Sequence, residues 1–550
     1  MNGRIPGTNA ATRLFVRLVL VSAVLGLSAR CLFAVNCPVV KHNPPSDADK
    51  ALLAADYSTA ESLYRAGLAA HPGDVDATVG LVHTLLREQK VLDADEAVKT
   101  ALDDEEAAKP APAASPNSAA LLTLRGEVEF RQGEPWVVEQ TVLASYKLDP
   151  CNPRTRLLFA RFAQVNSRYA AARQQIGLAH QFDPQDPEIR AAWIQTLPLP
   201  QRITEMEAYL SAPTGDDQET LRQMHSELDR WKKQTGEPAR ACRLVSTAAP
   251  ADIPFINLMG YNRTTRAFGL EMSLNGKPVR LQLGAGEGGL AVYRSAAERA
   301  GLKRLSQSEP GGPGGKPTYS AYADSIKVGS LEFQNCVVKV IDSGSPYDDG
   351  DGLIGMDVFS DYLVTEDYPM RKVQLGPVPV RPAEGTAPVP SLTTNVAQAD
   401  DPVAAPAGPF DRYIAPEMKD YTQIYRVANN LILPAVLNAS KVRLFILDLG
   451  ASETTISPGI AMDVSKVHEV DMGGRQKVIV ADEITYNFAH MSQKVKGVVA
   501  ADTSMTSKNL GMEISGFIGA NTFSLLIMHI DYRDGLVKFE YIPNRGYKFE

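Results

Sequence analysis

The sequence lacks the signatures of several common enzyme classes. It contains no HExxH motif, no GxSxG elbow and no GxxxxGK[ST] loop. These absences argue against a zinc metalloprotease, a serine hydrolase and a phosphate-binding loop, respectively. The five cysteines show no CxxC pair and no Cys/His spacing, so neither a metal site nor a cofactor is expected.

The sequence also lacks a basic cluster. The formal net charge is −8, and no run of Lys and Arg could form the positively charged face that nucleic acids require. We therefore expect no nucleic-acid partner. Hydrophobic residues make up 44% of the chain, which is enough to build sizeable cores. Beyond the N-terminal region, no segment has the roughly 20 consecutive apolar residues of a membrane span.

The N-terminus has the pattern of a secretory signal peptide. Three arginines within the first 17 residues precede the apolar run Leu18–Ala29, and Ala29 and Ala34 are small residues suited to cleavage. We assign residues 1–34 to a cleaved signal and expect a secreted or periplasmic protein, with an uncleaved membrane anchor as the alternative. Export would permit disulfides, but the sequence leaves open whether Cys37, Cys151, Cys242 and Cys336 pair.

A helical pattern extends over residues 45–240. Apolar residues recur there at steps of three and four, and the turns at Pro150 and Pro184 lie 34 residues apart, as in tetratricopeptide repeats. The residues expected to pack between helices are Ala60, Tyr64, Ala172, Ile176 and Ala179. The segment resembles a short tetratricopeptide array, with a non-repeating helical bundle as the alternative. Stacked helix pairs form a curved interaction surface rather than a reaction centre.

The pattern then changes to short strands. Alternating apolar residues over 252–379 and 413–550 predict two β domains, and the Pro/Ala-rich segment 380–412 predicts a linker. Asn275-Gly276 stands between two apolar alternations and predicts a tight hairpin.

The two β segments share landmarks in the same order. Two of the pairs are offset by 164 residues, one by 166 and one by 158, which indicates an internal duplication. The matched pairs are Gly355 with Gly519, Asp367 with Asp531, Gln282 with Asp448, and Ala323 with Ala481; the Gln282 match also pairs Gly284-Ala285 with Gly450-Ala451.

These motifs resemble the retropepsin-type aspartic protease family. The family pattern is an apolar strand, Asp-Thr/Ser-Gly-Ala and a later apolar-apolar-Gly, and Asp448-Leu-Gly-Ala followed by Phe517-Ile-Gly is similar to it. The first segment has Gln282-Leu-Gly-Ala instead. The resemblance covers nearly all of the mature chain, and helical repeats followed by two such domains look like exported bacterial proteins described as aspartyl-protease-like. It implies an α+β multidomain fold, with N-terminal helical repeats followed by two tandem all-β retropepsin-like domains.

The resemblance also implies a site. In the family, two carboxylates about 3 Å apart share one proton and activate a water. Asp448 would be the surviving carboxylate and Gln282 the substituted one, while Leu283 and Leu449 stand where the family has a hydroxyl. Without the duplication, Asp448 would be read as a strand-end Asp capping its own turn. The residues implied for the cleft and flap are Gly284, Ala285, Gly450, Ala451, Gly473 and Gly474.

Three functions are compatible with these residues. The first is a pseudoprotease that binds a protein or peptide in its cleft and recruits a partner through its helical repeats. The second is an active aspartic endopeptidase that uses Asp448, with two such turns meeting in a homodimer. The third is a structural protein whose β domains are a platform for the helices. Gln282 and the paired leucines favour the first or third, and whether the chain is an enzyme stays open.

Overall fold

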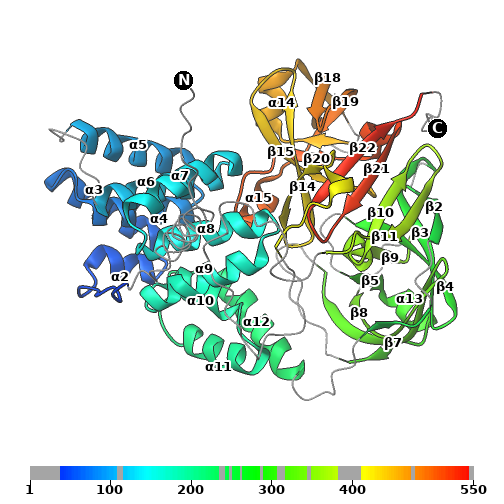
Figure 1. Cartoon of the computed structure of the whole chain (residues 1–550), viewed down its shortest axis with the longest axis horizontal. Coiled ribbons are helices and arrows are strands. Elements are labelled where there is room, and N and C mark those ends of the chain that lie inside the picture. Colours follow the sequence, from blue (N-terminus) through cyan, green and yellow to red (C-terminus); the bar gives the residue numbers. More distant parts are fainter. Residues whose placement is uncertain are drawn as a thin grey trace, which may run out of the picture.

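The computed structural model combines a helical array with two β lobes (Figure 1). It describes residues 37–107, 116–234, 242–246, 251–260, 263–284, 289–305, 316–342, 349–381, 411–471 and 477–543. The predicted signal segment and most of the predicted linker lie outside these ranges. None of the helices in the described part of the chain combines the length and apolar character that crossing a bilayer requires.

The helical array follows the predicted segment. Its helices are α2 (Asp47–Leu53), α3 (Tyr57–Ala70), α4 (Val75–Arg87), α5 (Val91–Ala107), α6 (Pro116–Arg131), α7 (Pro135–Leu148), α8 (Pro153–Val165), α9 (Tyr169–Phe182), α10 (Pro187–Ile194), α11 (Leu199–Leu210) and α12 (Gln218–Gln234). Consecutive helices pack as pairs and curve in the left half of Figure 1.

The predicted repeat matches the helix starts. Asn152 caps α8 through the Thr155 amide and Asp186 caps α10 through the Ile189 amide, and each cap is followed by a proline at the first helical position. The two starts therefore repeat the 34-residue step. The predicted packing positions are all buried: Ala60, Tyr64, Ala172, Ile176 and Ala179.

Lobe 1 covers residues 251–377. Its strands are β2 (Ala251–Met259), β3 (Thr265–Leu274), β4 (Lys277–Gly284), β5 (Leu290–Tyr293), β6 (Lys303–Arg304), β7 (Thr318–Val328), β8 (Leu331–Ile341), β9 (Gly352–Gly355), β10 (Tyr362–Asp367) and β11 (Lys372–Pro377), with α13 (Arg294–Arg299) and the 3-10 turn η1 (Met356–Phe359). The short strand β1 (Arg243–Leu244) pairs with β8. The predicted hairpin joins β3 to β4, and the positive φ angles of Asn275 and Gly276 suit its two-residue turn.

Lobe 2 covers residues 411–543. Its strands are β12 (Thr422–Gln423), β13 (Tyr425–Val427), β14 (Asn430–Leu437), β15 (Val442–Leu447), β16 (Thr455–Ile456), β17 (Val467–Asp471), β18 (Lys477–Phe488), β19 (Met491–Ala500), β20 (Gly516–Ile518), β21 (Leu526–Asp531) and β22 (Leu536–Tyr541). Its helices are η2 (Pro416–Met418), α14 (Pro458–Val464), α15 (Ser504–Leu510) and α16 (Ala520–Phe523).

The two lobes repeat one topology, as the duplication predicted. In lobe 1, β4 pairs in parallel with β9, β9 with β5 in antiparallel, and β5 in parallel with β8. In lobe 2, β15, β20, β16 and β19 pair in the same order and directions. Each lobe ends in a hairpin, β10–β11 or β21–β22.

These terminal hairpins join the lobes. β10 pairs with β21 in antiparallel, so the shared sheet contains a hairpin from each lobe (Figure 1). One hydrophobic core extends through both lobes and includes Leu281, Leu447, Phe445 and Phe523. The lobes are therefore held together by backbone hydrogen bonds as well as by apolar burial.

The helical array packs on lobe 2 through a second core. Phe130, Leu158 and Phe162 of the array lie in one buried cluster with Ile446 and Met512 of lobe 2. The Glu513 amide donates to the Arg131 carbonyl at 2.9 Å, which ties the two parts together at the edge of this cluster.

The four scattered cysteines are paired. One disulfide joins Cys37 to Cys151 and the other joins Cys242 to Cys336, closing separations of 114 and 94 residues. The first fixes the start of the described chain to the array, and the second fixes the segment after the array to β8. Cross-links of this span typically contribute about 2–4 kcal/mol.

Candidate functional site

The two motif strands end where the lobes meet. Phe268 of β3 donates its amide to the Gly450 carbonyl at 2.8 Å, and Ser452 donates to the Arg266 carbonyl at 3.3 Å. A Cβ on Gly450 would lie only 1.8 Å from the Leu283 carbonyl oxygen. Glycine is therefore required at position 450, because only its missing side chain lets this turn touch the strand of the other lobe.

Asp448 lies at this junction as a partly buried carboxyl. Its Oδ1 accepts a hydrogen bond from the Ala451 amide at 3.1 Å, and its own amide donates to the Ile518 carbonyl at 2.9 Å. Burial raises the pKa of Asp448 above its ordinary value, and the backbone amides of Ala451 and Gly450 oppose that rise. The bond to Ala451 is also the one that a capping Asp makes, so this contact fits both sequence interpretations of Asp448.

The strand register corrects the predicted partner of Asp448. Leu283 of β4 lies opposite Ile354 of β9, and Leu447 of β15 lies opposite Ile518 of β20. Because Ile354 and Ile518 occupy equivalent positions, Leu283 is the counterpart of Leu447. The next residue in each strand is Gly284 in lobe 1 and Asp448 in lobe 2.

The predicted equivalence of Gln282 and Asp448 is therefore wrong by two residues. Gln282 lies opposite Leu353 and is the counterpart of Ile446, which lies opposite Phe517. The Gly284-Ala285 match with Gly450-Ala451 fails with it. A glycine, rather than an amide side chain, stands where a second carboxylate would be needed.

Gln282 has a partner of its own. Its Oε1 accepts from Nη1 of Arg266 at 2.9 Å, and Arg266 belongs to the adjacent strand β3. This bond secures the β3–β4 edge beside the junction. We therefore describe Gln282 as a supporting residue of lobe 1.

The two predicted leucines are core residues. Leu283 and Leu449 are 0% and 3% exposed and belong to the core shared by the lobes. By the same register Leu449 is the counterpart of Ala285, so neither position has a hydroxyl group. Apolar packing takes the place of a cross-lobe hydroxyl hydrogen bond here.

Tyr368, which was not predicted as a site residue, contacts this turn and also contacts Glu366. The Tyr368 hydroxyl lies 3.0 Å from the Leu449 carbonyl oxygen and 3.0 Å from Oε2 of Glu366. A tyrosine hydroxyl has one proton, so both contacts are satisfied when Glu366 is protonated and donates to Tyr368. Burial raises the pKa of Glu366 to about 8, which favours that form. Asp367-Tyr368 is part of the duplicated landmark, and this was the sequence signal that pointed to the position.

We expect Glu366 to make stability depend on pH. The folded pKa of about 8 exceeds the ordinary 4.5, so the folded chain binds more protons between these values and stability falls as pH rises through them. Glu366→Gln should remove this slope and stabilise the protein by roughly 2–3 kcal/mol at pH 7. Urea unfolding at several pH values measures it, with the exposed Glu271→Gln as the control. Parallel pH profiles for wild type and Glu366→Gln would contradict the assignment.

Three predicted site residues remain. Ala285 and the flap glycines Gly473 and Gly474 lie outside the described residues. The flanking strands β17 and β18 do form an antiparallel hairpin around 472–476. Within the described ranges, no group of three or more His, Cys, Asp or Glu side chains is arranged to hold a metal ion.

One comparison with known protein families matches part of the chain. Residues 270–358, within lobe 1, match the family model described as aspartyl protease. No curated protein matches the chain in sequence.

Three solved structures were also compared with the chain. A retropepsin-like aspartic protease from Rickettsia conorii is 15% identical and covers 24% of this chain and 94% of its own, with a TM-score of 0.18. MamA AMB-1 is 14% identical, and the match covers 34% of this chain and 95% of MamA, with a TM-score of 0.20. YrrB, described as a TPR protein with an unusual peptide-binding site, is 14% identical, and the match covers 34% of this chain and 88% of YrrB, with a TM-score of 0.19.

Proposed function

We propose that this chain, whose residues 270–358 match the aspartyl protease family, is an exported protease-like protein that binds extended peptides without cleaving them. The observation that carries the proposal is the strand register, which makes Gly284 of lobe 1 the counterpart of Asp448 of lobe 2. Peptide hydrolysis in this family needs two carboxylates that share a proton. A glycine can neither ionise nor donate, so Asp448 lacks the partner that the reaction requires.

Peptide binding does not depend on that partner. Strands β6 and β17 lie at the ends of their sheet paths, and each leads into the segment where the family has its flap. An extended peptide can pair with a strand edge through backbone hydrogen bonds alone. The helical array, joined to lobe 2 by a buried core, supplies a second interaction surface. The two disulfides support an oxidising compartment and hence export.

An active endopeptidase is the second candidate. Asp448 favours it, because its carboxyl is partly buried and its pKa is raised, as a general acid requires. The contacts of the turn oppose a homodimer of two Asp448 turns. Gly450 already touches Leu283, and Phe268 already donates to the Gly450 carbonyl. A second Asp448 turn would have to displace lobe 1.

Unfolded casein distinguishes these candidates. We expect purified mature protein to leave it intact from about pH 3 to about pH 7, a range that includes the upper of the two pKa values of a typical dyad, about 4.7. Labelled casein peptides should still bind, and binding should survive Asp448→Ala. Cleavage that is blocked by a pepstatin-type inhibitor and lost in Asp448→Asn would establish the endopeptidase instead. Absence of both cleavage and binding would favour a structural platform.

A further inference from the structure

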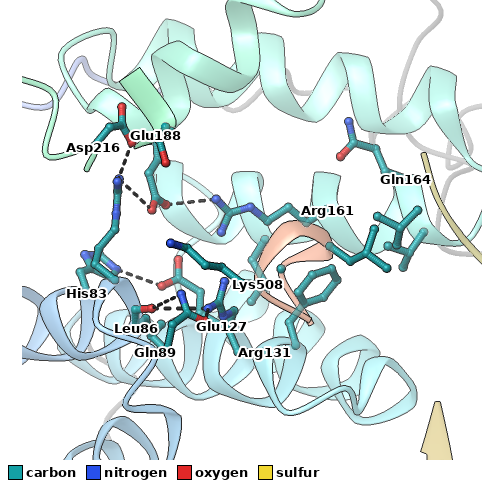
Figure 2. A pocket seen from close by; sticks show the side chains of 18 of the residues that line it. His83, Leu86, Gln89, Glu127, Arg131, Arg161, Gln164, Glu188, Asp216 and Lys508 are labelled. Carbon is teal, nitrogen blue, oxygen red and sulfur yellow. Dashed lines mark hydrogen bonds and ion pairs between the residues drawn. The ribbon is translucent and has the colours of Figure 1, made fainter. Parts of the chain in front are cut away.

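A pocket of about 590 Å³ lies between the helical array and lobe 2, away from the Asp448 turn. Its wall is formed by helices α4, α6 and α8 of the array, with α15 of lobe 2 on the other side (Figure 2). The volume falls within the range of small-molecule and cofactor sites. Because both parts contribute to the lining, the pocket exists only while the array is docked on lobe 2.

Five Arg and Lys residues line this pocket, among them Arg87 and Arg426, and the other three come from three different elements. Arg131 ends α6, Arg161 belongs to α8 and Lys508 belongs to α15, as Figure 2 shows. Cations brought together from separate elements repel one another, and enclosure weakens the screening by water. This arrangement therefore has a cost unless an anion compensates it.

The carboxylates that line the pocket already have partners. Glu188 contacts Arg87, Arg154 and Arg161, and its nearest pair is Arg154 at 2.6 Å. Asp216 pairs with Arg87 at 2.6 Å. Glu127 contacts His83 at 2.9 Å, and Asp217 contacts Lys508 at 3.3 Å.

Among the described residues, Arg131 forms no ion pair with these acids; Arg426 forms none either, but its Nη1 donates to the Tyr532 carbonyl. Its Nη2 donates to the Gln89 side-chain oxygen at 2.6 Å and to the Leu86 carbonyl at 3.4 Å, and both acceptors are neutral. Among the described residues, its Nε and Nη1 have no hydrogen-bond partner. Burial lowers the pKa of Arg131, and the neighbouring Arg161 and Arg87 lower it further, while the charge of Glu188 opposes this fall without reversing it.

We propose that this pocket binds an oxyanion-bearing ligand, a carboxylate or a phosphate, through Arg131 with Arg161 and Lys508 as flanking cations. The Nε and Nη1 groups of Arg131 can each donate a charge-assisted hydrogen bond to an oxygen of a carboxylate or phosphate, while Nη2 keeps its bonds to Gln89 and Leu86. The proposal goes beyond the cleft of the lobes, because none of these residues contacts the Asp448 turn. Occupancy would also bridge α6 of the array to α15 of lobe 2.

Calorimetric titration of the full mature chain at low ionic strength tests this site, since salt screens such contacts. The probes are acetyl-trialanine with a free C-terminal carboxylate, the same peptide as its amide, and inorganic phosphate. We expect the carboxylate or phosphate probe to bind and the amide to bind at least about tenfold more weakly. Binding of the free-carboxylate peptide alone would identify a peptide terminus as the source, and binding of phosphate alone would identify a phosphate group.

The variant Arg131→Gln should weaken binding of the anionic probe at least about tenfold. It should leave the melting temperature of the free protein unchanged or higher, because it removes an uncompensated cation. Arg125→Gln is the matched control, because Arg125 lies on the same helix and its exposed side chain pairs with Glu129. This variant should bind the probe as wild type does. The proposal is overturned if neither anion binds to wild type, or if Arg131→Gln binds it within about twofold of wild type.

Discussion

Replacing Gly450 with alanine is expected to separate the two lobes. The added Cβ would lie 1.8 Å from the Leu283 carbonyl oxygen and 2.7 Å from its carbon. Both are backbone atoms of a residue that is paired with β9 near the end of β4, so neither can rotate away. We expect a loss of roughly 3–5 kcal/mol and a melting temperature lower by about 10 °C, measured by calorimetry.

Gly459→Ala is the matched control for this substitution. Gly459 lies in α14, and a Cβ built there meets no atom within 4 Å. Alanine should leave stability unchanged or raise it by up to about 1 kcal/mol, since glycine is the weaker helix former. In Gly450→Ala, hydrogen exchange at the Phe268 amide should accelerate, because that amide donates to the Gly450 carbonyl. Normal melting and unchanged exchange would show that the lobe junction does not depend on Gly450.

The local elements could be predicted from the sequence because their signals are local. Asn275-Gly276 predicted a hairpin because both residue types readily take the positive φ angles of its turn, and the predicted turns at Pro150 and Pro184 lie directly before the starts of α8 and α10. The duplication was also visible, because the pairs Gly355 with Gly519 and Asp367 with Asp531 keep the 164-residue step that the strand register shows.

The partner of Asp448 was missed for a physical reason. Side chains in a strand alternate between faces, so a slip of two residues keeps every side chain on its own face. Matching Gln282 to Asp448 therefore preserved the apolar pattern and aligned two Gly-Ala pairs by chance. Only the parallel pairing of β4 with β9 and of β15 with β20 fixes the register, and such pairing joins segments about 70 residues apart.

The joining of the domains could not be predicted either. Lobe 2 strand β15 has buried residues on both of its faces: Phe445 packs in the core shared by the lobes, and Ile446 packs against Phe130 and Phe162 of the array. An apolar run predicts burial without naming the segment that covers it. The pocket around Arg131 is formed by the same docking. The sequence alone therefore could not show that charged residues of α6 and α15 line one pocket.

Gly284→Asp should restore a carboxylate pair, whereas Gln282→Asp should not. The register makes position 284 the counterpart of Asp448, and two residues along a strand correspond to about 6.6 Å. An acid at position 284 can therefore share a proton with Asp448. An acid at position 282 lies two residues earlier in the strand, too far from Asp448 to share one. We expect the pKa of Asp448, followed by carboxyl NMR, to rise above its wild-type value in Gly284→Asp and to stay unchanged in Gln282→Asp.

Activity should follow the same division between the two variants. Gly284→Asp combined with Leu449→Thr should cleave casein at acid pH at least about 10²-fold faster than wild type, because general acid–base catalysis typically contributes 10²–10⁴-fold. That cleavage should disappear when Asp448→Asn is added. Gln282→Asp combined with Leu449→Thr is the matched control, since it adds the same groups two residues away. Equal pKa shifts in the two single variants, or cleavage only by the Gln282→Asp pair, would mean that Gln282 is the counterpart of Asp448 after all.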